Sequence, residues 1–188
     1  AVACSATNPL VTKGNDWYFR VCFLDPFQGQ VMATYAVTKL NAKTACVIQE
    51  ISNDYSVGLA KFFMDSFVKL TKNDKSILAK PFSYNTGDND FTAQVTTISQ
   101  LKPDVIFAPG NYTESALIIK QARDQGIKIA FLGGDTWETD PFLEVGKLLE
   151  NYEPERLKVH FAGTCTLCRW RGFELVYEEF EPVGAVHE

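Results

Sequence analysis

The chain has 188 residues, of which 46% are hydrophobic and 22% are charged, and its formal net charge is −5. These values are typical of one globular domain, or of one domain with an appendage. The negative charge argues against nucleic-acid binding, which needs a basic face. No apolar run of the sequence approaches the length of a membrane span.

The first residues, AVACSATNPL, lack the basic start and the apolar stretch of a signal peptide. Because the sequence opens in an apparent strand, we expect it to begin inside a longer protein. Residues 1–17 are interpreted as an extended piece followed by a turn-rich connection.

The five cysteines are an odd number, so at least one thiol is unpaired within the chain. Cys22 and Cys46 lie in apolar runs and are interpreted as small buried hydrophobic residues.

Short apolar runs recur along the chain, separated by amphipathic stretches. Near-continuous apolar runs of this length are typical of strands that helices cover on both faces. The predicted strands are Tyr18–Phe23, Thr44–Gln49, Ser76–Phe82, Asp104–Ala108, Lys128–Leu132 and one further strand at Val159–Ala162.

Apolar residues at helical spacing fill the segments between these runs. Asp25-Pro26 is interpreted as an N-cap followed by a proline at the first helical position, with Gln28 completing a capping box. Strand and helix alternate at a steady interval, which predicts an α/β fold: a three-layer α-β-α lobe with a mainly parallel sheet. The predicted helical stripes are Leu59, Phe62, Phe63, Phe67 and Leu70; Phe91, Val95, Ile98 and Leu101; and Ala116, Ile119 and Ala122, which end at Gly126.

The loops after the predicted strands contain residues suited to binding a zwitterion. In an open parallel sheet, ligands bind beyond the carboxyl ends of the strands. There the sequence places Tyr55, Tyr112 and Asp135. A carboxylate and aromatic faces attract an ammonium group, and aromatic walls form an apolar slot. Each residue alone fits a turn or the core, but the three together on one edge favour a binding site.

Six segments carry a resemblance to a known family. They are SATNP (5–9), YFRVCFLDPFQGQ (18–30), NDYSVGLA (53–60), FTAQVTTI (91–98), PDVIFAPGNY (103–112) and IAFLGGDTWETDPFLEVG (129–146). In this order and spacing they resemble the periplasmic leucine/isoleucine/valine-binding proteins, the type I solute-binding proteins of ABC transporters. The resemblance covers residues 1 to about 147 and implies part of a periplasmic binding protein-like I fold.

The resemblance also implies a set of ligand-binding residues. The segment from Ser5 to Thr7 would line the carboxylate end of the ligand, and Asp135 would face its α-amino group. Aromatic residues of the second lobe would pack over the ligand, and Trp137 would shape the wall. The implied residues are Ser5, Ala6, Thr7, Tyr55, Asn111, Tyr112, Asp135 and Trp137.

The same resemblance divides the chain into three parts. Residues 1–17 would be a hinge-side segment of lobe one, residues 18–147 the ligand-binding lobe two, and residues 148–188 an atypical tail. Most of the first lobe is expected upstream. The tail does not match the family, and a truncated or shifted reading frame or a recombined end would explain it.

The resemblance implies that the protein binds a branched-chain or related amino acid without a cofactor and delivers it to the permease subunits of an ABC importer. Such a protein works in the periplasm or outside the cell, with or without a lipid anchor. Two alternatives stay open: a ligand-sensing lobe of a regulatory receptor, and a truncated fragment without binding activity.

The sequence offers little support for an enzyme or a metal site. Cys165 and Cys168 form a CxxC pair, but zinc needs four ligands, and the two histidines, His160 and His187, are awkwardly spaced for it. No phosphate-binding glycine loop and no G-x-S-x-G motif follows a predicted strand. Carboxylates at the strand ends leave acid–base chemistry conceivable, but we expect binding without catalysis.

Overall fold

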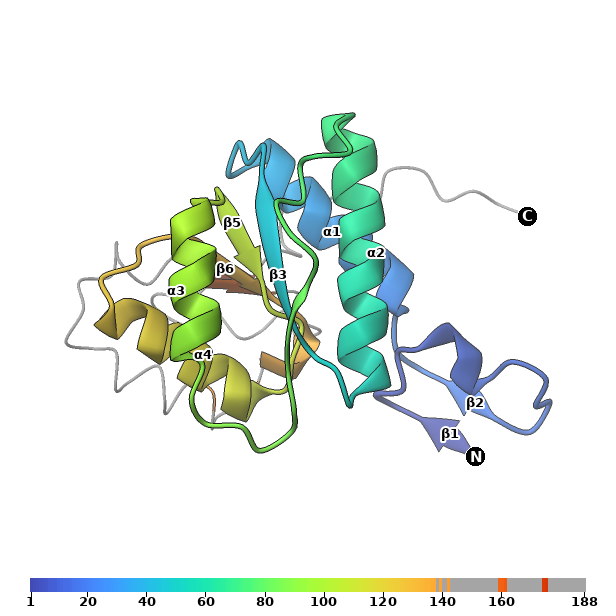
Figure 1. The fold of residues 1–188 in the computed structure, drawn as a ribbon. Coiled ribbons are helices and arrows are strands. Elements are labelled where there is room, and N and C mark those ends of the chain that lie inside the picture. Colours follow the sequence, from blue (N-terminus) through green and yellow to red (C-terminus); the bar gives the residue numbers. More distant parts are fainter. Residues whose placement is uncertain (138, 140–141, 143–158, 162–173, 176–188) are drawn as a thin grey trace.

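The computed structural model describes residues 1–137, 139, 142, 159–161 and 174–175 (Figure 1). The described strands are β1 (Val2–Ala3), β2 (Phe19–Arg20), β3 (Ala45–Glu50), β4 (Phe82–Tyr84), β5 (Val105–Phe107), β6 (Ala130–Gly133), β7 (Val159–Phe161) and β8 (Glu174–Leu175). The described helices are α1 (Asp25–Thr38), α2 (Asp54–Thr71), α3 (Thr92–Leu101) and α4 (Tyr112–Asp124), with short 3-10 helices η1 (Pro9–Val11) and η2 (Asp135–Trp137).

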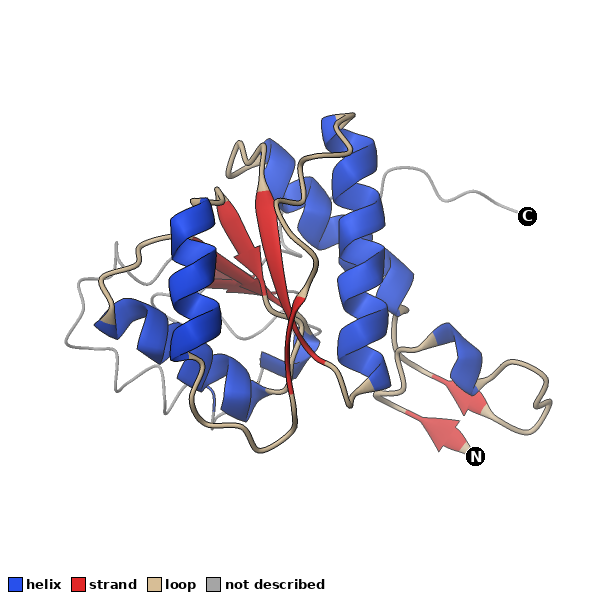
Figure 2. Ribbon diagram, in the orientation of Figure 1, coloured by secondary structure: helices blue, strands red, loops and turns tan. Residues whose placement is uncertain are grey.

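The main sheet has the strand order β4-β3-β5-β6-β7-β8, and every described pairing in it is parallel. Helices lie on both of its faces (Figure 2). This arrangement confirms the predicted three-layer α/β fold with a parallel sheet. The strand predicted at Val159–Ala162 is also confirmed, as β7.

Each face of the sheet has its own hydrophobic core because successive side chains of a strand point to opposite faces. From β3, Ala45 and Val47 pack with residues of α1 and α2, whereas Cys46 and Ile48 pack with residues of α3 and α4. Figure 1 shows the same division, with α1 and α2 on one side of the sheet and α3 and α4 on the other. The uninterrupted apolar run of β3 is therefore the consequence of burial on both faces.

Helices α1 and α2 pack closely through a glycine. A Cβ atom added to Gly29 would lie 2.7 Å from Cβ of Phe62 and 2.8 Å from the backbone nitrogen of Phe63. Any side chain at Gly29 would therefore push the two helices apart. Of the apolar stripe predicted on α2, Phe63 and Phe67 are fully buried, as expected. Leu70, at the end of this stripe, is 41% exposed.

Two predicted strands differ from the structure. The run Ser76–Phe82 does not form one strand: Ile77 makes an isolated bridge to Ala45, and β4 begins at Phe82, just after Pro81, which has no N–H to donate. The run Tyr18–Phe23 was predicted to be a strand that helices cover on both faces, and this is wrong. It contains β2, which, among the described strands, pairs only with β1 in a separate two-stranded sheet.

The misplaced strand has a simple physical explanation. An apolar run indicates a strand but not the surface that covers it. In the structure, Phe19 is 59% exposed and Val21 is 73% exposed, so this run is not buried on both faces. The segment that carries β1 and β2 projects from the α/β body (Figure 1). Among the described helices, none is long and apolar enough to cross a membrane.

Candidate functional site

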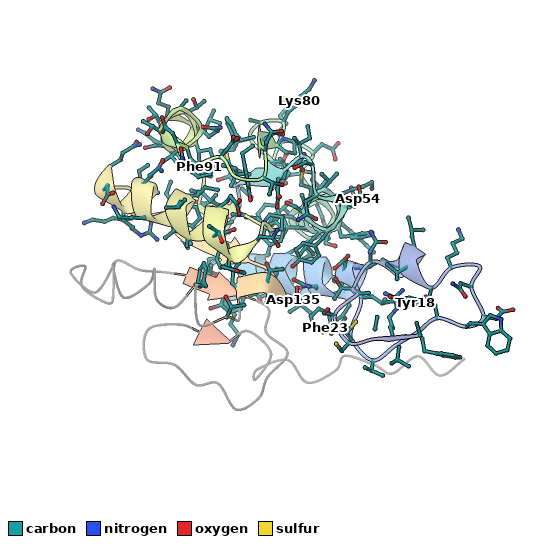
Figure 3. The ribbon with its side chains drawn as sticks, turned by 90° about the horizontal axis from the view of Figure 1, so that it is seen from below. Tyr18, Phe23, Asp54, Lys80, Phe91 and Asp135 are labelled. Atoms are coloured by element: carbon teal, nitrogen blue, oxygen red, sulfur yellow. The ribbon has the colours of Figure 1, made fainter. Side chains whose placement is uncertain are left out.

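A cavity of about 620 Å³ lies where the N-terminal segment meets the carboxyl-end edge of the sheet. Asp135, which Figure 3 labels, is one of the residues that line it. The residues that line the cavity are Cys4, Ser5, Ala6, Thr7, Asn8, Val11, Cys22, Asn53, Tyr55, Asn111, Asp135 and Thr136. Six of the eight predicted site residues are in this set: Ser5, Ala6, Thr7, Tyr55, Asn111 and Asp135.

Three neighbouring parallel strands supply one side of the cavity. Tyr55 follows β3 at the start of α2, Asn111 follows β5 just before α4, and Asp135 follows β6 at the start of η2. Because β3, β5 and β6 are parallel and adjacent, their carboxyl ends meet at one edge, where open α/β sheets bind ligands. The sheet topology thus brings these three loops around one space.

The carboxylate of Asp135 is held by two side chains. The phenol of Tyr55 donates a hydrogen bond of 2.6 Å to Oδ1 of Asp135. Gln28 donates from Nε2 to the same oxygen at 3.1 Å and accepts from the backbone N–H of Asp135 at 3.0 Å. Burial raises the pKa of Tyr55 well above its usual value, and the negative charge of Asp135 adds to the effect. The phenol therefore stays protonated and acts as a donor.

A second acid, Asp25, lies behind this group. It is fully buried, and neither of its carboxylate oxygens has a hydrogen-bond partner of normal geometry. Its pKa is raised from 3.8 to about 6, chiefly by burial and to a smaller extent by the charge of Asp135, while the Thr7 hydroxyl and the charge of Arg20 oppose the shift. Near neutral pH, Asp25 thus titrates in a site that disfavours its charged form.

The wall of the cavity that residues 4–8 form is held in place by Arg20. Its guanidinium donates to the backbone oxygens of Ala6 and Asn8, both at 2.8 Å, and to the Thr12 hydroxyl at 2.9 Å. The loop is tied to the α/β body by a further bond, from the backbone N–H of Asp25 to the backbone oxygen of Thr7 at 3.0 Å. One arginine therefore fixes the backbone of the segment that carries three predicted ligand-binding residues.

Glu50, at the end of β3, connects two of the loops. It is 1% exposed, and its Oε2 accepts hydrogen bonds from the side-chain amides of Asn53 at 3.0 Å and Asn111 at 3.4 Å. Its other carboxylate oxygen accepts from the hydroxyl of Thr86. Glu50 is not among the residues that line the cavity, but it orients the side-chain amides of two residues that are.

Two predicted site residues are not among those lining the cavity. Trp137 is fully buried in the core, where its ring stacks on Phe142 with a centroid distance of 4.8 Å. Tyr112 is the first residue of α4 and is 38% exposed. The preceding residue, Asn111, lines the cavity in its place.

Sequence reasoning missed several residues of the site. Gln28 was predicted to close a capping box with Asp25, and this is wrong: α1 has Leu24 as its N-cap without a side-chain bond, and Gln28 binds Asp135 instead. Cys22 was interpreted as buried, but it is partly exposed and lines the cavity, whereas Cys46 is buried as expected; both are free thiols. The other lining residues missed are Cys4, Asn8, Val11, Asn53 and Thr136.

In the described part of the chain, no group of three or more His, Cys, Asp or Glu side chains could hold a metal ion. The CxxC pair of Cys165 and Cys168 lies outside the described residues. The arrangement around Asp135 is instead suited to binding: an oriented carboxylate, polar amides and a backbone wall surround an open cavity.

Comparison with known proteins agrees with this geometry. A family model described as periplasmic binding protein matches residues 2–147. The chain is 33% identical over 141 residues to the "Amino acid binding protein" of Pseudomonas aeruginosa, covering 74% of this chain and 36% of that protein. It is 31% identical over 147 residues to the "Leu/Ile/Val-binding protein homolog 3" of Brucella melitensis, covering 77% of this chain and 38% of the relative. The chain thus spans well under half the length of these curated relatives.

Solved structures give the same result. The leucine binding protein LivK of Thermotoga maritima superposes with a TM-score of 0.69 at 41% identity, covering 74% of this chain and 39% of that one. LivJ of Streptococcus pneumoniae, a branched-chain amino acid transporter substrate binding protein in complex with isoleucine, gives 0.75 at 31% identity, covering 89% and 45%. By sequence and by fold, the chain belongs to the periplasmic binding protein family.

Proposed function

We propose that the chain binds a branched-chain or related amino acid non-covalently, as part of the solute-binding component of an ABC importer. The observation that carries this proposal is the environment of Asp135. Its carboxylate lines the cavity and is oriented by Tyr55 and Gln28 through Oδ1. None of the described residues donates a hydrogen bond to Oδ2, so this oxygen is available to a ligand ammonium group.

The remaining lining residues suit the rest of an amino acid. We assign Ser5, Ala6 and Thr7 to the carboxylate end, because this N-terminal segment lines the same cavity and offers the hydroxyls of Ser5 and Thr7. Tyr55 supplies an aromatic face near the amine, and Asn111 supplies an amide on the same side. We assign no direct ligand contact to the buried Trp137, and Tyr112 would reach the ligand only by turning toward the cavity.

The names of the relatives support the class of ligand. The Brucella relative is named as a Leu/Ile/Val-binding protein, and the LivJ structure holds isoleucine. We therefore propose an aliphatic L-amino acid as the ligand, permease subunits as the partner, and a place outside the cytoplasmic membrane. In this proposal residues 1–17 belong to the hinge side of a first lobe and residues 18–147 to the second lobe, and the protein acts by binding rather than by catalysis.

Calorimetric titration with L-leucine tests the proposal. The protein as its host expresses it should bind L-leucine, and Asp135→Ala should weaken binding by roughly 2–5 kcal/mol, because a buried ammonium would lose its charge partner. The isolated 188-residue chain should bind much more weakly, since closure against the first lobe would bury the ligand. Unchanged affinity of Asp135→Ala, or micromolar affinity of the isolated chain, would contradict the proposal.

The importer role needs a separate test. Deleting the gene in its host should reduce the uptake of radiolabelled leucine, and the intact gene should restore it whereas the Asp135→Ala allele should not. Uptake that stays at the parental level, with binding intact in the purified protein, would remove the transport role and leave the binding role standing.

A further inference from the structure

We infer that Gln28 is a positioning residue of the proposed amine site: it fixes the Asp135 carboxylate so that a single oxygen, Oδ2, faces the ligand. This inference rests on the proposed function. Gln28 is fully buried on α1 and is not among the residues that line the cavity. It would therefore act on the ligand only through Asp135, which lies 107 positions further along the chain.

The side-chain amide of Gln28 forms hydrogen bonds with both the backbone N–H and the carboxylate of Asp135. A backbone N–H can only donate, so the atom that accepts from Asp135 N at 3.0 Å must be the amide oxygen of Gln28. The amide nitrogen of Gln28 is then the atom that faces Oδ1 of Asp135, at 3.1 Å. One planar group thus holds the backbone and the carboxylate of Asp135 together, and this restricts rotation of the carboxylate.

Tyr55 completes the arrangement. Its phenol donates to Oδ1 at 2.6 Å, so this oxygen accepts two hydrogen bonds. Both donors approach the same oxygen, and the described residues leave Oδ2 without one. An ammonium group in the cavity would meet one carboxylate oxygen in a fixed direction, which is how a site is preorganised for a charged ligand.

The packing around Gly134 keeps these groups in place. A Cβ atom at Gly134 would lie 2.2 Å from the Tyr55 hydroxyl and 2.6 Å from Oε1 of Gln28. The backbone of the loop after β6 therefore approaches both side chains as closely as a glycine allows. A side chain at position 134 would therefore displace Gln28 or Tyr55.

The variant Gln28→Glu gives a readout that a merely structural role would not produce. When its carboxyl group is ionised, Glu at position 28 faces Oδ1 of Asp135 with a negative oxygen in place of an N–H donor. When the same group is protonated, its O–H can donate to Oδ1 as the amide did. Asp135 and the Tyr55 phenol face this group, and Asp25 on the same helix interacts with Asp135 through its charge. Because neighbouring carboxylates resist ionising together, the proton should be retained well above the usual range of a glutamate.

The experiment measures L-leucine affinity by calorimetry from pH 5.5 to pH 8.5 in the protein as its host expresses it. Affinities are compared as the ratio of variant to wild type at each pH, which removes effects common to both. Gln28→Glu should bind about 10–100-fold more weakly at pH 8.5, the worth of a hydrogen bond to a charged group, and recover to within about threefold at pH 5.5. Gln28→Met, which cannot donate at any pH, should bind weakly throughout.

Gln30→Glu is the matched control, since it makes the same charge change on the exposed face of the same helix; its ratio should stay near one at every pH. Circular dichroism melting curves identify variants that fail to fold, and Tyr55→Phe, which removes the other donor to Oδ1, then serves as the second variant and should also weaken binding. If folded Gln28→Met binds like wild type, if Tyr55→Phe does so in its place, or if the Gln28→Glu ratio is independent of pH, the inference is wrong.

Asp135→Asn separates this inference from the proposed function. If Asp135→Asn binds like wild type, the amine site itself is refuted. If Asp135→Asn binds weakly while the folded Gln28 variants bind normally, only the positioning role fails. In the double variant Gln28→Met with Asp135→Asn, the Gln28 substitution should cause little further loss, because the carboxylate it positions is gone.

Discussion

Tyr55 and Asp135 are 80 residues apart in the sequence, yet the phenol of Tyr55 donates a 2.6 Å hydrogen bond to Oδ1 of Asp135. Tyr55 belongs to the loop after β3 and Asp135 to the loop after β6, with β5 between these strands. The bond therefore spans two strand spacings along one edge of the sheet. Asp135 and Tyr55 thus form a fixed acidic surface in the ligand-free cavity, which we call the floor of the cavity.

The close approach of Gly134 to this floor predicts a loss of binding on a small substitution. A methyl group at Gly134 would collide with the Tyr55 hydroxyl at 2.2 Å. Gly134→Ala should therefore displace Tyr55 or the loop, which lowers the free energy of unfolding by roughly 1–3 kcal/mol and weakens L-leucine binding. Calorimetric titration measures this loss.

Gly58 provides the matched control for that variant. It lies inside α2, and the nearest atom to an added Cβ is Nδ2 of Asn8 at 3.9 Å. Gly58→Ala should leave ligand affinity unchanged and raise the free energy of unfolding by about 0.5–1 kcal/mol, because alanine favours a helix interior over glycine. Equal affinities of Gly134→Ala and Gly58→Ala would show that the floor is not tightly packed.

The buried carboxyl of Asp25 predicts a pH-dependent stability difference. Its pKa is raised from 3.8 to about 6, chiefly by burial, so the folded protein holds this proton more tightly than the unfolded chain does. Ionising Asp25 therefore destabilises the fold progressively as pH rises from about 4 to 6, and fully above that window. Since one pH unit corresponds to about 1.4 kcal/mol, the effect amounts to roughly 2–3 kcal/mol.

Asp25→Asn removes the ionisation and tests this account. The variant should be more stable than wild type at pH 7.5 and close to wild type at pH 4, with the difference growing between these values. Urea unfolding at a series of pH values measures it. A stability difference that is the same at pH 4 and pH 7.5 would mean that Asp25 does not change its charge in this window.

Arg20 predicts a local effect on the cavity wall. Its guanidinium donates to Ala6, Asn8 and Thr12 at 2.8–2.9 Å, and a lysine cannot reproduce this planar pattern of donors. Arg20→Lys should destabilise the wall by about 1–3 kcal/mol and make the segment around Asn8 a site of proteolytic cleavage. Limited proteolysis with mass spectrometry locates the cut.

A surface variant shows whether that effect is specific. Lys61 pairs with Asp65 on the exposed side of α2, where such a pair contributes little. Lys61→Ala should leave the proteolytic pattern unchanged. A cleavage pattern of Arg20→Lys identical to that of wild type would mean that the wall holds its shape without the arginine.

Much of the fold was predictable from the sequence because both faces of the main sheet are covered. The runs at Thr44–Gln49 and Asp104–Ala108 have no polar alternation, and the structure places them in β3 and β5, between two layers of helices. The run at Tyr18–Phe23 has the same appearance but forms an exposed ribbon. The local hydrophobic pattern of the sequence predicts that a strand forms, but it does not predict which strand it pairs with or which layer covers it.

The site was predictable only in part, for a related reason. Tyr55, Asn111 and Asp135 could be expected at one edge because parallel topology alone brings their loops together. The roles of Gln28 and Arg20 depend on contacts between distant segments, such as the 107 positions between Gln28 and Asp135, and no local pattern encodes them. Trp137 was predicted to shape the wall of the site. In the structure its side chain is fully buried in the core and packs against Gly133.

The most direct test of the account compares two ligands on two proteins. L-leucine and 4-methylpentanoate differ in the ammonium group, and wild type and Asp135→Asn differ in the carboxylate proposed to receive it. Calorimetry on all four combinations should show that loss of the ammonium weakens binding strongly in wild type and little in Asp135→Asn, with a coupling energy of about 1.5 kcal/mol or more. If the two losses simply add, Asp135 does not face the amine, and the proposed site is wrong.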